Sequence, residues 1–94
     1  MSSEARAVLG KMTRTERRVA RNVRNDAAAS MGMSRRQFMW AVKNEDENAI
    51  EELKLSAIES EAMAGWEYDE ERFQRFLNMI INFIKAIMMI FGGI

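Results

Sequence analysis

The last nineteen residues, 76–94, are almost entirely apolar, and any fold of this chain has to bury most of them. Their few polar side chains are not scattered, because Arg75, Asn78, Asn82 and Lys85 recur every three or four positions. At about 100° per residue, this spacing gathers them on one narrow stripe of a helix. The sequence therefore predicts a helix over 70–91 with a broad apolar surface.

Two environments suit such a helix. It is long enough to cross a bilayer, but Lys85 near its centre costs about 2.5–3.5 kcal/mol on insertion, so a lone spanning helix is marginal. The alternatives are the core of a soluble helical oligomer and a membrane bundle of several copies with the polar stripe inward. The other predicted helices are weakly apolar, so we expect that one chain cannot cover this helix and that copies associate through it. The predicted oligomerisation residues are Phe73, Phe76, Leu77, Ile80, Ile81, Phe83, Ile84, Ile87 and Phe91.

The formal net charge of zero hides three blocks of different charge. Residues 1–43 carry ten Lys or Arg and three Asp or Glu, which gives +7. Residues 44–72 carry two and eleven, which gives −9, and the apolar end adds only Arg75 and Lys85. Such segregation indicates separate tasks for the basic, acidic and apolar thirds of the chain.

The composition excludes several classes of site, because the chain has no proline, cysteine or histidine. Disulfides, thiolate or imidazole metal sites and catalysis by cysteine or histidine are ruled out. The absence of proline and the scarcity of alternating β-branched residues favour an all-α fold. The carboxylates of the acidic third follow no calcium-loop pattern, and we find no catalytic constellation or phosphate loop. We therefore expect a protein that is not an enzyme and that has no cofactor or metal.

Residues 24–43 predict two helices joined by a tight turn. Gly32 tolerates the positive φ that such a turn needs, and Ala28 is small enough to lie where the helices cross. Ser34 and Gln37 form a Ser-x-x-Gln capping box that opens the second helix. We expect a small core closed by Met31, Met33, Phe38 and Val42, with Met39 and Trp40 facing outward.

The same region reads Ala28-x-x-x-Gly32-Met33-Ser34-Arg35-Arg36-x-Phe38, then Val42-Lys43-Asn44-Glu45-Asp46-Glu47. This pattern resembles the helix-turn-helix of phage small terminase subunits and related DNA-binding proteins, over residues 20–60. That family commonly places an acidic helix after the second helix, as this chain does. The resemblance implies a factor that presents DNA to a packaging motor. It would place Arg35, Arg36 and Gln37 at base edges, at the start of the recognition helix.

Arginines of the preceding helix fall at spacings of three and four, so they share one face as a basic ridge. One interpretation is that this ridge engages phosphates. The other is a solvated face, or one that pairs with the acidic third of the same or a neighbouring chain. The predicted phosphate contacts are Arg14, Arg17, Arg18, Arg21, Arg24 and Lys43.

The remaining elements follow from caps. We expect a first helix over 3–10 and a second that begins at the Thr13–Glu16 capping box and ends at Ser30. A third helix should span 35–43. A fourth should span 45–64, with Asn44 and Glu47 forming its cap. Asp69 caps the last helix, and segments 45–64 and 70–91 form an αα-hairpin. The predicted organisation is a basic helix-turn-helix-like module, 1–44, and an acidic-plus-apolar hairpin, 45–94, that mediates oligomerisation or membrane association.

These features favour a small homo-oligomeric DNA-binding protein of the small terminase type, located in the cytoplasm. The alternative is a small membrane-associated or virion structural protein that assembles through residues 70–94. In that case the basic third would contact anionic headgroups or the acidic third of its neighbours. The expected partners are further copies of the chain and DNA, with a membrane under the alternative. We expect no small-molecule substrate.

Overall fold

The computed structural model describes residues 3–60 and 69–92, and these residues form an all-helical fold. The elements are α1 (Ser3–Lys11), α2 (Arg14–Ser30), α3 (Arg35–Lys43), α4 (Glu47–Ile58), α5 (Glu70–Ile87) and the π-helical segment η2 (Met88–Gly92). No strand occurs in this described part of the chain. The predicted all-α class is confirmed, and the first three helices lie within a residue of their predicted bounds.

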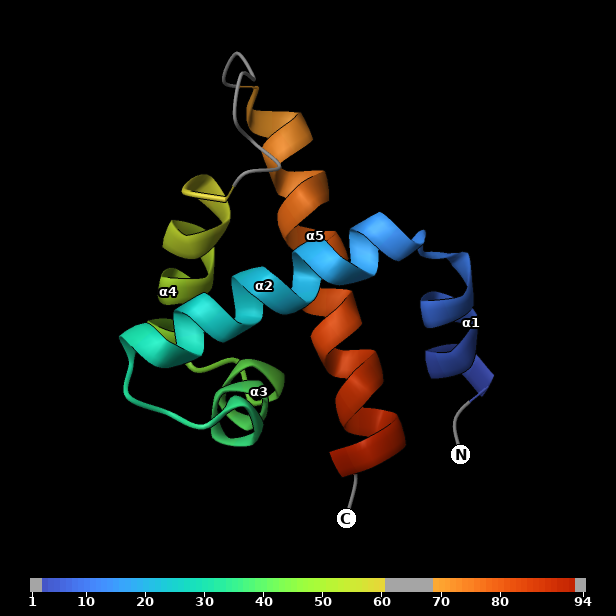
Figure 1. Ribbon diagram of the computed structural model, residues 1–94, viewed down its shortest axis with the longest axis horizontal. Helices are drawn as coiled ribbons and strands as arrows, with labels where there is room; N and C mark the ends of the chain where they lie inside the picture. Colours follow the sequence, from blue (N-terminus) through green and yellow to red (C-terminus); the bar gives the residue numbers. More distant parts are fainter. Residues whose placement is uncertain (1–2, 61–68, 93–94) are drawn as a thin grey trace.

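Helix α5 is the axis around which the other helices are arranged. In Figure 1 it runs through the middle of the molecule, with α2 crossing it, α1 on one side, and α3 and α4 on the other. Helices α1, α2 and α3 all pack against α5, whereas α4 packs chiefly against α2 and has few contacts with α5. The Oγ atom of Ser56 on α4 donates a hydrogen bond to the Val23 carbonyl of α2 at 2.9 Å. The predicted αα-hairpin of α4 and α5 is therefore not confirmed.

The inner side of α5 lies in the hydrophobic core of its own chain. Five of the nine predicted oligomerisation residues are buried there, namely Phe73, Leu77, Ile80, Phe83 and Ile84. The expectation that one chain cannot cover this helix is therefore wrong for its inner side. The covering helices combine larger apolar residues, such as Val23 of α2 and Phe38 of α3, with alanines, whose small side chains let helices approach closely. These buried alanines include Ala5 of α1 and Ala20, Ala27 and Ala28 of α2.

The outer side of α5 keeps the polar stripe that the sequence predicts. Arg75, Asn78 and Asn82 are exposed and Lys85 is half-buried. The other predicted oligomerisation residues Phe76, Ile81 and Ile87 are half-buried and pack against the core, and Phe91 of η2 is 72% exposed. Of the nine predicted residues, these four keep some accessible surface.

Three of the predicted helix caps are confirmed. The Thr13 hydroxyl accepts a hydrogen bond from the Glu16 N–H at 3.0 Å, while the Thr13 N–H donates to the Glu16 carboxylate at 2.8 Å. Ser34 and Gln37 make the same reciprocal pair at the start of α3, at 3.1 and 3.0 Å. Asp69 accepts from two backbone N–H groups of the first turn of α5. Each pair satisfies donors that a helix start otherwise leaves without partners.

The turn between α2 and α3 is built on the predicted glycine. Gly32 has a φ of 65°, and its N–H donates to the Ala29 carbonyl while the Met33 N–H donates to that of Ala28. This is the Schellman pattern, in which a residue in the left-handed region ends a helix. Ser34 caps the next helix two residues later, so the direction change takes only a few residues.

The turn between α3 and α4 repeats this pattern with a different residue. Glu45 has a φ of 59°; its N–H donates to the Val42 carbonyl, and the Asp46 N–H donates to that of Ala41. Asp46, whose Oδ1 accepts from the Ala49 N–H at 3.0 Å, then caps α4. The predicted cap Asn44 is therefore wrong, because Asn44 ends α3 and α4 begins two residues later than expected. Helix α4 ends at Ile58, and the rest of the predicted 45–64 helix reaches beyond the described residues.

Glu45→Gly should raise the free energy of unfolding by about 1 kcal/mol, because glycine adopts a positive φ without the steric cost that a Cβ atom imposes. Urea denaturation measures the change. The control is Glu51→Gly, the same substitution at an exposed position inside α4, which should lower the free energy of unfolding by about 1 kcal/mol. Changes of the same sign in both variants would show that Glu45 is not strained.

Candidate nucleic-acid interface

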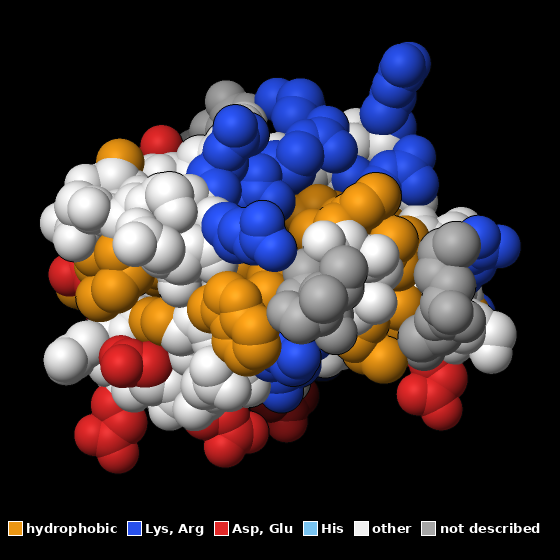
Figure 2. Space-filling view, turned by 90° about the horizontal axis from the view of Figure 1, so that it is seen from below, with side chains coloured by type: hydrophobic (Ala, Val, Ile, Leu, Met, Phe, Trp, Pro, Cys, Tyr) orange, Lys and Arg blue, Asp and Glu red, His pale blue; other side chains and the backbone are white. Residues whose placement is uncertain are grey.

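The basic ridge of α2 faces solvent, on the side of the helix away from α5. Arg14, Arg18 and Arg21 are exposed. Arg17 is half-buried, and its Nη1 donates to the Leu9 carbonyl of α1 at 3.2 Å, so part of its bonding capacity holds α1 against α2. Figure 2 shows Lys and Arg side chains gathered along one edge of the molecule and Asp and Glu along the opposite edge.

Arg24 differs from the rest of the ridge because it is buried, with 6% of its surface exposed. Its Nε donates to the Asn25 side-chain oxygen at 3.0 Å, and its Nη1 lies 3.6 Å from the Met39 sulfur of α3. Arg24 thus lies between α2 and α3, and its predicted role as a surface phosphate contact does not fit this position.

The electrostatic environment of Arg24 shows that the two helices share one basic region. Burial lowers the pKa of the Arg24 guanidinium, and the charges of Arg35 and Arg21 lower it further. The group stays charged at neutral pH, because an arginine pKa lies far above it. Arg21 of α2 and Arg35 of α3 are therefore close enough to Arg24 to repel it. We define the basic patch as Arg14, Arg18, Arg21, Arg35 and Arg36.

The first turn of α3 presents its polar side chains to solvent. Arg35, Arg36 and Gln37 are all exposed. The Gln37 Oε1, however, accepts the Ser34 N–H at 3.0 Å as part of the capping box. Its predicted reading of a base edge therefore competes with its role in starting the helix, whereas the two arginines have no such commitment to the cap.

The outward face of α3 differs from the prediction at one residue. Met39 is buried at 9% exposure, because it belongs to the core cluster and contacts Arg24, while Trp40 is 37% exposed as expected. Lys43 is half-buried, and its Nζ lies 4.8 Å from the centroid of the Trp40 ring. The predicted phosphate contact Lys43 is thus held over an aromatic ring.

A cleft of about 430 Å³ separates the start of α3 from the end of α5. One wall is polar and basic, and the other is apolar. Its lining residues are Ser34, Arg35, Arg36, Met39, Ile87, Met88 and Phe91. This cleft could not be predicted from the sequence, because residues 35 and 91 lie far apart in the chain and come together only when α5 and η2 pack against α3.

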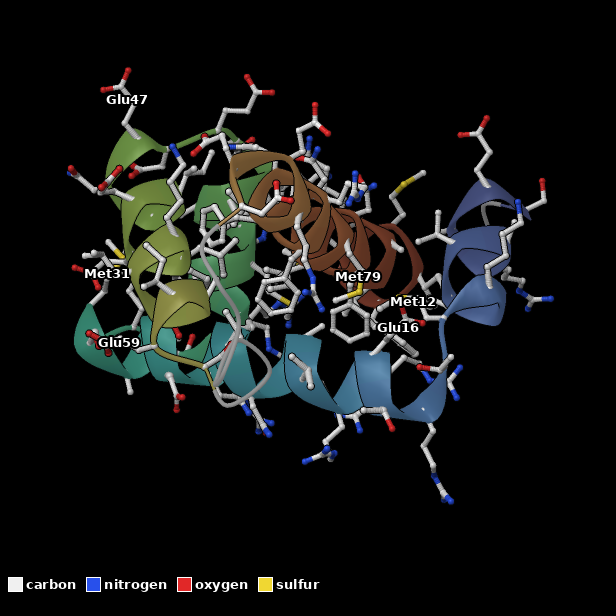
Figure 3. All side chains as sticks on the ribbon, turned by 90° about the horizontal axis from the view of Figure 1, so that it is seen from above. Met12, Glu16, Met31, Glu47, Glu59 and Met79 are labelled. Carbon is white, nitrogen blue, oxygen red and sulfur yellow. The ribbon has the colours of Figure 1, made fainter. Side chains whose placement is uncertain are left out.

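The described carboxylates of the acidic third lie on and beside α4 and at the start of α5. In Figure 3, Glu47 of α4 points away from the molecule, while Met12 and Met79 lie on the inner side between α1, α2 and α5.

Within residues 3–60 and 69–92, no group of three or more acidic side chains is placed to hold a metal ion. One helical stretch of the described residues, Glu70–Phe91, is long and apolar enough to span a membrane by length and composition alone.

Comparison of the chain with protein families, with curated proteins and with solved structures finds no match. The geometry of the site therefore carries the functional argument.

Replacing Arg24 should separate the packing of its stem from its charge. Arg24→Met keeps a long stem and removes a buried charge, so the free energy of unfolding should stay unchanged or rise by up to about 1 kcal/mol. Arg24→Ala also removes the stem and should lower it by about 1–3 kcal/mol. Urea denaturation measures both, with the exposed Arg14→Ala as the control, expected within about 0.5 kcal/mol of the parent. If Arg24→Met lowered the free energy of unfolding as much as Arg24→Ala does, the charge of Arg24 and not the packing of its stem would stabilise the fold.

Proposed function

We propose that this protein binds DNA through the basic patch and acts without enzymatic chemistry. The observation that carries the proposal is the exposure of Arg14, Arg18 and Arg21 on α2 and of Arg35 and Arg36 at the start of α3, on the two helices that enclose the buried Arg24. Guanidinium groups that repel one another in the free protein are stabilised when a polyanion lies across them. A DNA backbone supplies that polyanion.

The arrangement of α2 and α3 supports a helix-turn-helix interpretation. In Figure 1, α3 is seen nearly end-on while α2 runs across the view, so the two helices cross steeply. Ala28 is buried on the inner side of α2, and Gly32 makes the turn. Such motifs use the start of the second helix to contact base edges, and here that turn carries the exposed Arg35 and Arg36.

In this proposal each part of the basic patch has its own role. Arg14, Arg18 and Arg21 contact phosphates and fix the orientation of the protein. Arg35 and Arg36 enter the groove from the first turn of α3, where the guanidinium geometry suits guanine. The finer proposal is a factor of the small terminase type that presents DNA to a packaging motor, in the cytoplasm. Self-association would use Phe76, Ile81, Ile87 and Phe91, the predicted contacts that stay accessible.

The second candidate is a membrane-associated or virion structural protein that uses the end of α5. The observation that favours it is the exposure of Met89 and Phe91 in η2, at 44% and 72%, with Phe91 lining the cleft together with Arg35 and Arg36. DNA binding is better supported, because insertion of α5 into a bilayer would remove Phe83 and Ile84 from the core and so unfold the chain. Flotation with anionic liposomes separates the two proposals.

DNA affinity measured against salt concentration tests the proposed patch. We expect log K to fall linearly with log salt, and each lost phosphate contact should make the slope shallower by about 0.9. Arg21→Gln should reduce the slope in this way. The matched control is Lys54→Gln on α4, which removes one positive charge outside the patch and should leave the slope unchanged. A slope near zero in the parent protein, or equal effects of the two substitutions, would contradict the proposal.

A further inference from the structure

Trp40 is the large aromatic side chain that α3 leaves outside the core. It is 37% exposed and does not belong to the core cluster, whereas its neighbour Met39 does. A helix turns by about 100° per residue, so three successive large side chains cannot all point inward, and Phe38 and Met39 are both buried. Met39 fills the inner position beside Arg24, which leaves the indole at the surface.

Two cations flank this ring on the same face of α3. Arg36 and Lys43 stand four residues before and three residues after Trp40, spacings that place side chains on one side of a helix. Arg36 is exposed, and the Lys43 Nζ lies 4.8 Å from the ring centroid. The resulting stripe alternates a cation, an aromatic ring and a cation. We call Arg36, Trp40 and Lys43 the α3 stripe.

This composition differs from what a duplex groove requires. The hydrogen-bond pairings that read duplex bases are made by Arg, Lys, Asn, Gln and carboxylate side chains, and an indole is not among them. A flat ring flanked by cations is the arrangement that binds unpaired bases, which stack on the ring while the cations hold the backbone. Trp40 keeps 37% of its surface exposed although the Lys43 ammonium lies over the ring, and a base would stack on this exposed part of the indole.

We propose that the α3 stripe binds single-stranded nucleic acid, with one unpaired base stacked on Trp40 and the flanking phosphates on Arg36 and Lys43. This inference rests on the proposed function, because the basic patch would hold the rest of the strand. The proposed ligand is then a nucleic acid that contains at least one unpaired base.

The test compares a fluorescein-labelled fifteen-nucleotide dT strand with a dA·dT duplex of the same length, by fluorescence anisotropy. Stacking on an aromatic side chain contributes about 1–3 kcal/mol per base. Trp40→Leu should therefore weaken binding of the single strand by about tenfold, since tenfold corresponds to about 1.4 kcal/mol. The same change should alter duplex affinity by less than about twofold, and Trp40→Phe should retain most of the single-strand affinity because it keeps a ring.

A second readout reports stacking directly. The chain has two tryptophans, so in a Trp66→Phe background Trp40 is the sole emitter. The dT strand should quench its fluorescence, and the duplex should quench it much less. The matched control is Ile58→Ala, an exposed apolar residue on α4, which should change neither affinity.

The outcomes distinguish the inference from the function on which it rests. If both nucleic acids bind but Trp40→Leu weakens neither, or weakens both equally, the single-strand site is wrong while DNA binding stands. Binding of the strand without quenching of Trp40 also overturns the site. If neither nucleic acid binds the parent protein, the proposed function fails and this inference fails with it.

Discussion

The need to cover α5 sets the arrangement of the other helices. Its inner side carries Phe83, Ile80 and Ile84, which are almost completely buried, and burying such side chains is the largest favourable contribution that a chain of this size has. Helices α1, α2 and α3 supply the cover by packing against it. Once the apolar side of α2 faces α5, its arginines are forced to the opposite side. The basic patch is therefore a consequence of how the core forms.

The same constraint explains the buried arginine. Arg24 lies on α2 at the edge of the core, where Met39 of α3 packs beside it. Its long stem fills space between the helices, and its guanidinium meets Arg35 at the start of α3. Helices α2 and α3 therefore pack around a positive charge. Burial and the two neighbouring arginines both make the charged form of that guanidinium less stable. Under the proposed function, a polyanion bound across Arg21 and Arg35 would offset this cost, because opposite charge stabilises guanidinium groups that repel one another.

Features coded within a few residues could be predicted from the sequence. The Thr13–Glu16 and Ser34–Gln37 boxes and the turn at Gly32 depend on neighbours three to five residues apart, and the structure has all of them. The turn at Glu45 escaped prediction because a glutamate does not mark a positive φ, although the Schellman hydrogen bonds form all the same. With that turn in place, Asp46 rather than Asn44 is positioned to cap α4.

Features that depend on distant contacts could not be predicted. The apolar surface of α2 was underestimated because alanines count little in a hydropathy pattern, yet Ala20, Ala27 and Ala28 are almost fully buried and let neighbouring helices approach closely. The choice of α2 rather than α5 as the chief neighbour of α4 involves the Ser56 bond to Val23, across thirty-three residues. Similarly, the periodicity of α3 alone did not decide between Met39 and Trp40 as the inward residue. The packing of α3 against α2 and α5 decided it.

The separation of charge by the fold has a consequence for binding that the net charge conceals. A formal charge of zero gives the whole molecule no overall attraction to a polyanion. The basic and acidic side chains gather along opposite edges of the molecule (Figure 2), however, so under the proposed function this charge separation would turn the basic patch toward DNA. Salt screens charges beyond about 8–10 Å under ordinary conditions, so α4 barely weakens a contact made at the patch. The salt dependence of binding then follows from the number of local phosphate contacts, and the approach to DNA is restricted to the face that carries the first turn of α3.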